Sequence, residues 1–141
     1  MILQYKLSNN PLRIKNLSKE ILSTLKIAPI GEILGHPASC VFVPREVFQE
    51  YHLKAFDCTV IGEFLEITRF VVQDKGQGYG SRILADLDEW ARGRGLRLCL
   101  TPQPYGDVSE KSQKRLIRFY ERNGFVMVKE GEWCPEAMYR P

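Results

Sequence analysis

The chain has 141 residues, a usual length for one domain, so we expect a single domain over residues 1–141. Apolar residues make up 44% of the chain and charged residues 26%, values that exclude the weakly hydrophobic, highly charged composition of a disordered protein. The net charge of +3 is too small to indicate a nucleic-acid partner without a local basic patch.

No apolar run approaches the roughly 18 residues that span a bilayer, so we expect no membrane partner. The N-terminal residues MILQYK lack the basic start and apolar stretch of a signal peptide, which favours a cytoplasmic location. The cysteines are widely separated and form no C-x-x-C pair, so we expect no metal site and no disulfide framework. All four are expected to be reduced thiols: Cys40, Cys58, Cys99 and Cys134.

The first half of the chain carries weaker secondary-structure signals than the second half. It predicts a strand near residues 2–7, a helix near 17–25, a strand near 39–43 and a short helix opening at Pro44. A β-branched and aromatic stretch then predicts a strand at 64–72, preceded by a shorter strand at 58–61 and a turn at Gly62 and Glu63. We expect these two strands to form a hairpin.

An amphipathic helix is predicted after this hairpin, because five apolar residues fall at helical spacing before Gly93. These five are Ile83, Leu84, Leu87, Trp90 and Ala91. Residues 96–100 predict a further strand. Because a helix-length crossover separates this strand from residues 64–72, we expect the two to be parallel in a right-handed βαβ unit.

Another helix is predicted to open at residues 107–110, where Asp107 and Glu110 have the spacing of a capping box. Its end is marked by Asn123 and Gly124, after which residues 125–128 resume strand character. Four residues share one face of this helix: Gln113, Leu116, Ile117 and Tyr120.

Three alternating glycines, Gly76, Gly78 and Gly80, lie between the strand predicted at 64–72 and the amphipathic helix that follows it. They allow a sharp turn that points several backbone N–H groups at one place at the helix N-terminus, which favours an anion. The spacing matches neither the dinucleotide fingerprint nor the ATP phosphate loop. A flexible connection without a ligand is the alternative that the loop alone leaves open.

Two motifs lie one strand and one helix apart in the second half of the chain. They are KGQGYG at residues 75–80 and FYERNGF at residues 119–125. Together they resemble the Arg/Gln-x-x-Gly-x-Gly/Ala pyrophosphate loop and the helix-ending YxxxGF segment of the GNAT superfamily, with Lys75 where the family usually has Arg or Gln. The resemblance implies an α/β (α+β) GNAT fold, whose central sheet is mixed, mostly antiparallel and twisted, with one parallel βαβ crossover and helices on both faces.

The resemblance also implies an activity and a cosubstrate. Members of the family bind acetyl-CoA in a cleft where the two parallel strands splay, and the pantetheine arm pairs with the exposed edge of the first strand. We therefore expect an N-acetyltransferase that moves an acetyl group from acetyl-CoA to a primary amine by direct transfer in a ternary complex, without a metal. The acetyl-CoA-binding residues implied by the motif positions are Phe70, Val71, Val72, Lys75, Gly76, Gln77, Gly78, Tyr79, Gly80, Ser81, Ser112 and Gln113.

Acetyl transfer to an amine needs a proton for the departing CoA thiolate and a proton acceptor for the amine. Tyr120 matches the family tyrosine near the thioester sulfur, which implies that it is the general acid; core packing is the alternative that periodicity favours. Glu66 is the candidate general base, because it stands four residues before Phe70, where some members carry the proton acceptor. The open alternatives are an ion pair of Glu66 with Arg69 or Arg97, a solvated Glu66 carboxylate, and a histidine base at His36 or His52.

Four cations recur at helical spacing along the last helix: Lys111, Arg115, Arg118 and Arg122. A solvated face is the plain interpretation, and contact with the nucleotide end of CoA or attraction of an acidic acceptor is the functional one. The sequence leaves the acceptor open between small-molecule and peptide amines, and the protein between monomer and homodimer. The alternative function is a non-catalytic GNAT-fold module that binds CoA, a partner protein or nucleic acid.

Overall fold

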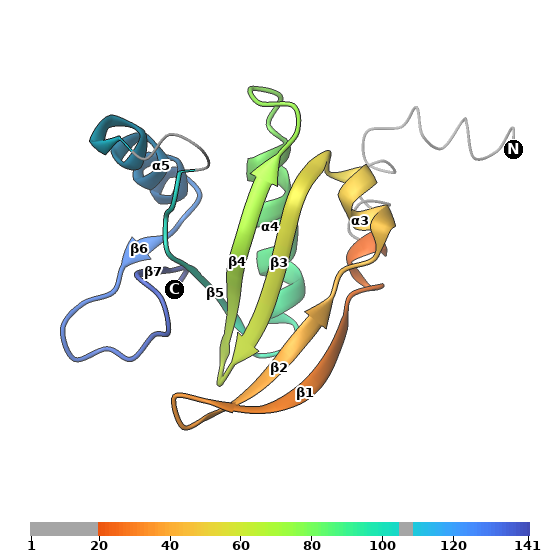
Figure 1. Ribbon diagram of the computed structural model, residues 1–141, viewed down its shortest axis with the longest axis vertical. Coiled ribbons are helices and arrows are strands. Elements are labelled where there is room, and N and C mark those ends of the chain that lie inside the picture. The colour runs from red at the N-terminus through yellow and green to blue at the C-terminus, as the bar shows by residue number, and fades with distance from the viewer. Residues whose placement is uncertain (1–19, 105–108) are drawn as a thin grey trace, which may run out of the picture.

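The structure, a computed structural model, describes residues 20–104 and 109–141. Within these residues seven strands form one sheet in the order β1-β2-β3-β4-β5-β7-β6 (Figure 1). The strand expected at residues 2–7 lies outside them. The elements are β1 (Lys26–Ile33), β2 (His36–Phe42), α3 (Arg45–Glu50), β3 (Leu53–Ile61), β4 (Phe64–Val72), α4 (Tyr79–Arg92), β5 (Arg97–Leu100), α5 (Glu110–Arg122), β6 (Val126–Met127) and β7 (Met138–Tyr139).

The sheet is antiparallel except between β4 and β5, which run parallel and are joined through α4. The expected α+β class, with a mixed sheet and one parallel crossover, is therefore confirmed. The β3–β4 hairpin is also confirmed, with β3 longer at its start than expected. Among the residues that the structure describes, no helix has both the length and the hydropathy needed to cross a membrane.

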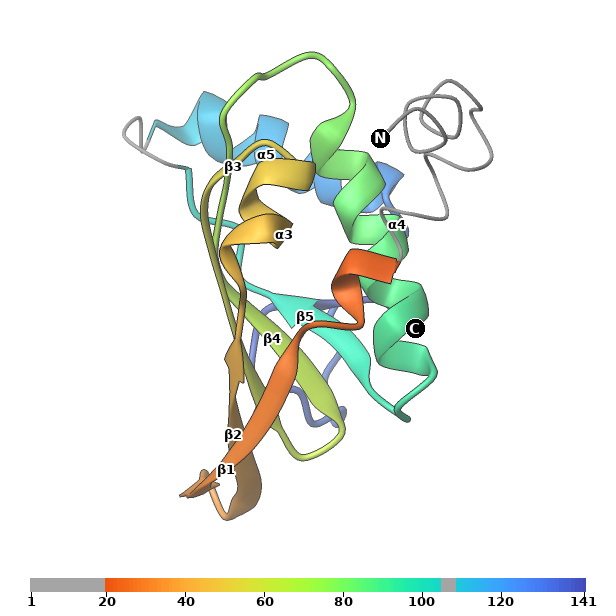
Figure 2. The same cartoon turned by 90° about the vertical axis from the view of Figure 1, so that its right-hand side faces the viewer.

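The core lies between the sheet and the helices α3 and α4, which cover one of its faces (Figure 2). The apolar residues predicted for α4 are all buried, and the helix ends at Gly93 as expected. From the sheet, Leu65 and Ile67 of β4 join the same apolar cluster. Alternate residues of β4, including Glu66, face the other side of the sheet. β4 thus contributes to the core from one face and carries Glu66 on the other.

The helix predicted over residues 17–25 is wrong at its C-terminal end. Within the described residues it covers only 20–22, and the chain enters β1 at Lys26. Sequence reasoning also missed β1 itself, because Pro29 and Gly31 are residues that usually interrupt strands. β1 is an edge strand with a bulge between these two residues, and an edge tolerates a proline that cannot donate to a ladder.

The capping residue predicted for α5 is also wrong. Ser109 is the N-cap, and its hydroxyl accepts a hydrogen bond from the backbone N–H of Ser112 at 3.2 Å. The helix therefore begins later than a cap at Asp107 would place it, and Asp107 itself lies outside the described residues. Serine caps a helix as well as aspartate does, so residue type does not distinguish Asp107 from Ser109 two positions later. The predicted end at Asn123 and Gly124 is confirmed.

Replacing the fully buried Leu65 by alanine should lower the free energy of unfolding by about 2–5 kcal/mol, because the cavity left in the core is only partly refilled. Leu34→Ala is the matched control, since this leucine is 72% exposed, and should cost less than about 0.5 kcal/mol. Urea unfolding of both variants measures the difference. Equal losses would contradict the placement of β4 at the centre of the core.

Candidate active site

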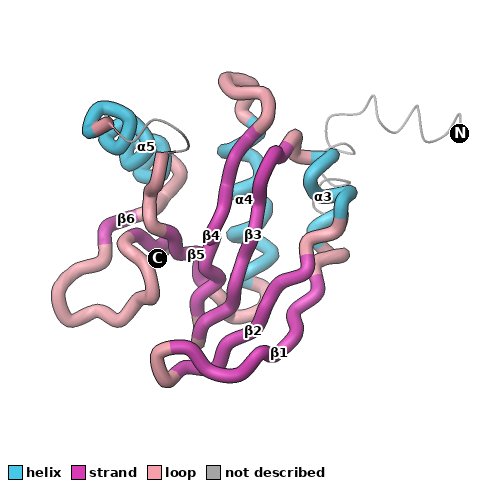
Figure 3. The backbone as a smooth tube through the Cα atoms, in the orientation of Figure 1, coloured by secondary structure: helices cyan, strands magenta, loops and turns pink. Residues whose placement is uncertain are grey.

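The strands β4 and β5 part half-way along β4. Their last parallel pair joins Ile67 to Leu100, whereas β3 stays paired with the other edge of β4 as far as Leu53 and Val72. Figure 3 shows the chain beyond β5 running away from β4 towards α5. Within the described residues no strand pairs with this edge of β4 after Ile67. Its backbone groups are available to an amide-containing ligand that binds like a strand.

The glycine loop connects the unpaired end of β4 to α4. Gly76 and Gly78 have φ angles of 82° and 80°, in the left-handed region that favours glycine. Gly78 is the N-cap of α4 and has no side chain to cap the first N–H groups, which leaves them to an anion. Gly80 permits close packing, because a Cβ there would lie 3.2 Å from Phe119 and 3.5 Å from Val72.

A cavity of about 660 Å³ joins the edge of β4, the glycine loop, the start of α4 and one face of α5. Eleven of the site residues predicted from the sequence line this cavity: Phe70, Val71, Val72, Lys75, Gly76, Gly78, Tyr79, Gly80, Ser81, Ser112 and Tyr120. The other seven lining residues were not among the acetyl-CoA-binding residues predicted from the sequence, although Arg115 and Arg122 belong to the cationic stripe. They are Asp74, Gln103, Pro104, Arg115, Leu116, Phe119 and Arg122. Residues from two motifs 40 positions apart are thus brought together.

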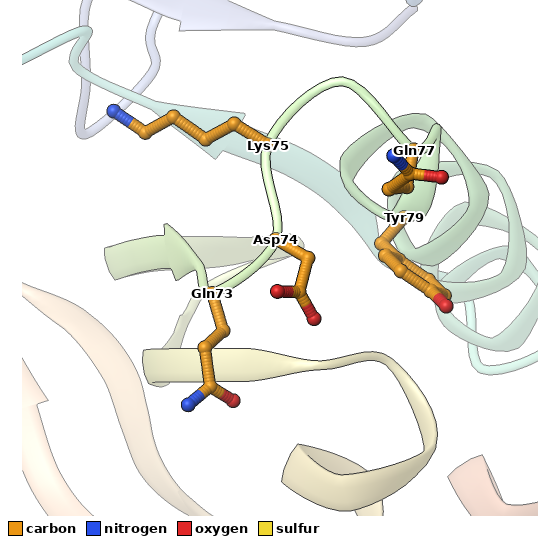
Figure 4. A pocket seen from close by; sticks show the side chains of 5 residues that line it. All are labelled: Gln73, Asp74, Lys75, Gln77 and Tyr79. Atoms are coloured by element: carbon orange, nitrogen blue, oxygen red, sulfur yellow. The ribbon is translucent and has the colours of Figure 1, made fainter.

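Gln77 and Gln113 do not line this cavity. Gln77 lines a second hollow of about 510 Å³ together with Gln73, Asp74, Lys75 and Tyr79 (Figure 4). The side-chain Nε2 of Gln113 donates to the carbonyl of Pro102 at 2.8 Å. This bond ties α5 to the segment that follows β5, so Gln113 shapes the site and does not face it.

Tyr120 is 5% exposed and lines the cavity from α5. Its ring makes edge contacts with Phe119 and Phe125, at centroid distances of 5.3 and 5.6 Å. Burial raises the pKa of its phenol, which therefore stays protonated at neutral pH. Tyr120 is therefore part of the core and also lines the cavity.

The cationic stripe on α5 divides between two surroundings. All four residues are exposed, but Arg115 and Arg122 line the cavity, whereas Lys111 and Arg118 do not. The helix face that meets the cavity follows positions 112, 115, 116, 119, 120 and 122. The sequence does not indicate this helix face, because it mixes polar, apolar and charged residues and no single residue type repeats along it.

Glu66 lies one residue before the point where the strands part, on the face of the sheet away from the core cluster. The alternative ion pairs of Glu66 with Arg69 or Arg97 are not formed, because these cations bind Asp57 and Glu63 at 3.7 and 2.6 Å.

The partner of Glu66 is Glu136, in the segment before β7. Partial burial, followed by the hydrogen bond to Glu136 and the nearby charge of that carboxyl, raises the pKa of Glu66 to about 8. The hydroxyl of Thr101 donates to Glu136. Glu66 does not line the cavity described above.

Neither histidine lines the cavity. His36 stacks on Trp133 with ring centroids 3.7 Å apart, and His52 stacks on Tyr79 at 4.0 Å. In the described part of the chain no group of three or more His, Cys, Asp or Glu could hold a metal ion. The four cysteines are free thiols, and the side chains of Cys99 and Cys134 form a hydrogen bond with each other.

All the residues that line the cavity fall within a match to a known family. A sequence model described as "Acetyltransferase (GNAT) family" matches residues 33–125, more than half of the chain. The chain belongs to this family. A search among curated proteins gives no match. Among solved structures the chain is similar to the crystal structure of anti-CRISPR protein AcrVA5, with 27% sequence identity, a TM-score of 0.51 and coverage of 61% of this chain and 87% of that one.

Membership of the GNAT family makes the protein an acyltransferase, and acetyl-CoA is the cosubstrate that this family generally uses. The matched range contains the free edge of β4, the glycine loop and Tyr120. It stops before β7 and Glu136, so the carboxyl partner of Glu66 comes from the part of the chain that the family match leaves out.

Replacing Gly78 by valine should abolish the rise in melting temperature that acetyl-CoA causes by mass action. A Cβ there disfavours the φ of 80° and places a branched side chain where the phosphates approach the backbone. Gly131→Val is the matched control, because Gly131 has a φ of 87° and equally open surroundings but lies outside the cavity. Thermal unfolding with and without acetyl-CoA tests this, and an unchanged shift in Gly78→Val would refute it.

Proposed function

We propose that this GNAT protein is an N-acetyltransferase that moves an acetyl group from acetyl-CoA to a primary amine by direct attack in a ternary complex. The observation that carries the proposal is a single cavity that joins a free strand edge, a helix N-terminus without a side-chain cap and a buried tyrosine. These three features meet the needs of an amide-rich arm, a pyrophosphate and a leaving thiolate.

The cavity suits acetyl-CoA in size and chemistry. Its volume of about 660 Å³ falls in the range of sites that bind cofactors. The edge of β4 offers backbone partners to the pantetheine amides, and the first N–H groups of α4 face the pyrophosphate. Lys75, Arg115 and Arg122 line the same cavity and add positive charge for the phosphates.

Tyr120 is proposed as the general acid. Attack of a neutral amine on the thioester carbonyl forms the new C–N bond and expels a thiolate, which must receive a proton. A phenol whose pKa is raised by burial holds its proton at neutral pH until that thiolate appears. The apolar contacts of its ring with Phe119 and Phe125 fix the hydroxyl in one position.

Glu66 is proposed as the general base. Its position one residue before the parting of the strands supports this role. A carboxyl with a pKa of about 8 accepts a proton from an attacking amine more readily than an ordinary glutamate does. The acceptor would then approach from the face of the sheet that carries Glu66 and Glu136.

The direct test is turnover of acetyl-CoA with a library of small amines and peptides, read by free thiol release and by the mass of an added acetyl group. We expect both signals in proportion for at least one amine. Binding of acetyl-CoA without either signal for any amine would favour the non-catalytic module instead.

Replacing Tyr120 by phenylalanine should lower kcat by about 10²- to 10⁴-fold, because only the proton donor is lost while the ring remains. The KM for acetyl-CoA and the melting temperature should stay near their original values. Tyr139→Phe is the matched control, since it removes a hydroxyl that bonds Glu132 outside the cavity. Full kcat in Tyr120→Phe, with chemistry limiting turnover, would refute the role.

The pH profile of kcat/KM should rise through about pH 8 and then level off, because Glu66 acts as a base only when ionised. Glu66→Gln should remove this rise. Glu136→Gln should keep the rise but move its midpoint to lower pH, since it removes a negative neighbour that raises the pKa. The acceptor amine titrates in the same way with the unchanged protein, Glu66→Gln and Glu136→Gln. Identical pH profiles for these three proteins would therefore contradict the assignment of Glu66 as the base.

A further inference from the structure

His52 lies beside the glycine loop although it is more than 20 positions away in the sequence. It directly precedes β3, and the antiparallel pairing of Leu53 with Val72 brings it next to the end of β4. Its carbonyl accepts a hydrogen bond from the N–H of Gln73 at 2.7 Å. The end of one helix and the start of the loop are therefore joined at this residue.

The side chain of His52 makes two further contacts. Its Nδ1 lies 2.9 Å from a carboxylate oxygen of Asp74, and its ring stacks on that of Tyr79 with centroids 4.0 Å apart and planes 13° from parallel. Asp74 stands at the start of the loop and Tyr79 is the first residue of α4. One imidazole thus touches both ends of the glycine loop.

The loop shape agrees with this arrangement. Figure 4 shows the side chains of Asp74 and Tyr79 on one side of the loop, while Lys75 extends in the opposite direction. Between the two ends, Gly76 and Gly78 hold left-handed φ angles, and glycine loses more conformational freedom on ordering than other residues do. A contact that closes the ends of such a loop reduces the entropy that a ligand must still remove on binding.

The backbone of His52 supports a specific role. Its φ of 53° lies in the left-handed region, which is uncommon for a residue with a side chain. Asparagine or glycine would adopt this conformation at lower cost. The histidine therefore occupies a position where its backbone is strained and its ring has two partners on the loop.

We propose that His52 is a positioning residue for the coenzyme. It holds the glycine loop in the shape that presents the N-terminus of α4 to the pyrophosphate. Its Nδ1 also contacts the carboxylate of Asp74, which would repel phosphate if it were free. The inference rests on the proposed function, because it takes the anion at this loop to be the pyrophosphate of acetyl-CoA.

The test is calorimetric binding of CoA to the full chain and to His52→Asn. Asparagine keeps the left-handed backbone and removes the stacked ring, so Kd for CoA should rise about three- to tenfold. The loss should appear in KM for acetyl-CoA and not in kcat at saturation. His36→Asn is the matched control, because it removes another stacked histidine, away from the loop, and should leave Kd unchanged.

A double-mutant cycle with Tyr79→Leu separates positioning from general destabilisation. If the ring acts through Tyr79, the double variant should bind CoA no more weakly than the weaker single variant. Additive losses would overturn the proposal. His52→Gly is a second way to remove the ring, and it also relieves the backbone strain, so wild-type affinity in a folded His52→Gly would overturn it as well.

These outcomes remain distinct from failure of the proposed function. Absence of CoA binding by the unchanged protein would refute acetyl-CoA as the ligand of this loop, and the inference with it. Binding by the unchanged protein with equal affinity in His52→Asn would refute the positioning role alone.

Discussion

The parting of β4 from β5 after the pair of Ile67 and Leu100 is the constraint on which the site depends. β3 keeps β4 in the sheet as far as Val72, so the strand stays extended while its second edge has no strand partner among the described residues. Backbone polar groups inside a protein need partners, and a ligand with amide groups can supply them. The glycine loop and α5 then enclose this edge, and Tyr120 lines the same cavity.

Much of the second half of the fold followed from the sequence, because local signals and long-range packing agree there. The apolar spacing of α4 matches its buried face, and Gly93 ends it. The first half was harder to predict. β1 contains Pro29 and Gly31 and is exposed along its whole length, so it carries no apolar alternation that would reveal a strand. Its pairing with β2 is a tertiary fact that no local pattern records.

The candidate site was predictable where a motif fixes the backbone and not where side chains meet from distant elements. The glycine loop and Tyr120 were found because their motifs resemble those of the GNAT family, and both line the cavity. The contact of Glu66 with Glu136 joins β4 to the segment before β7, 70 positions later. It gives Glu66 a partner of the same charge, whereas the sequence left an arginine partner open as an alternative. The sequence suggests His52 only as an alternative general base, because nothing in it indicates the contact of this residue with Tyr79.

Amide hydrogen exchange in the presence and absence of acetyl-CoA tests the central claim most directly, because it reports on the free edge of β4 itself. We expect protection of backbone amides in residues 68–72 and in the first turn of α4 when acetyl-CoA is added, with the β1–β2 hairpin unchanged as an internal reference. Binding of acetyl-CoA that leaves exchange at residues 68–72 unaltered, while protecting another part of the sheet, would contradict the account.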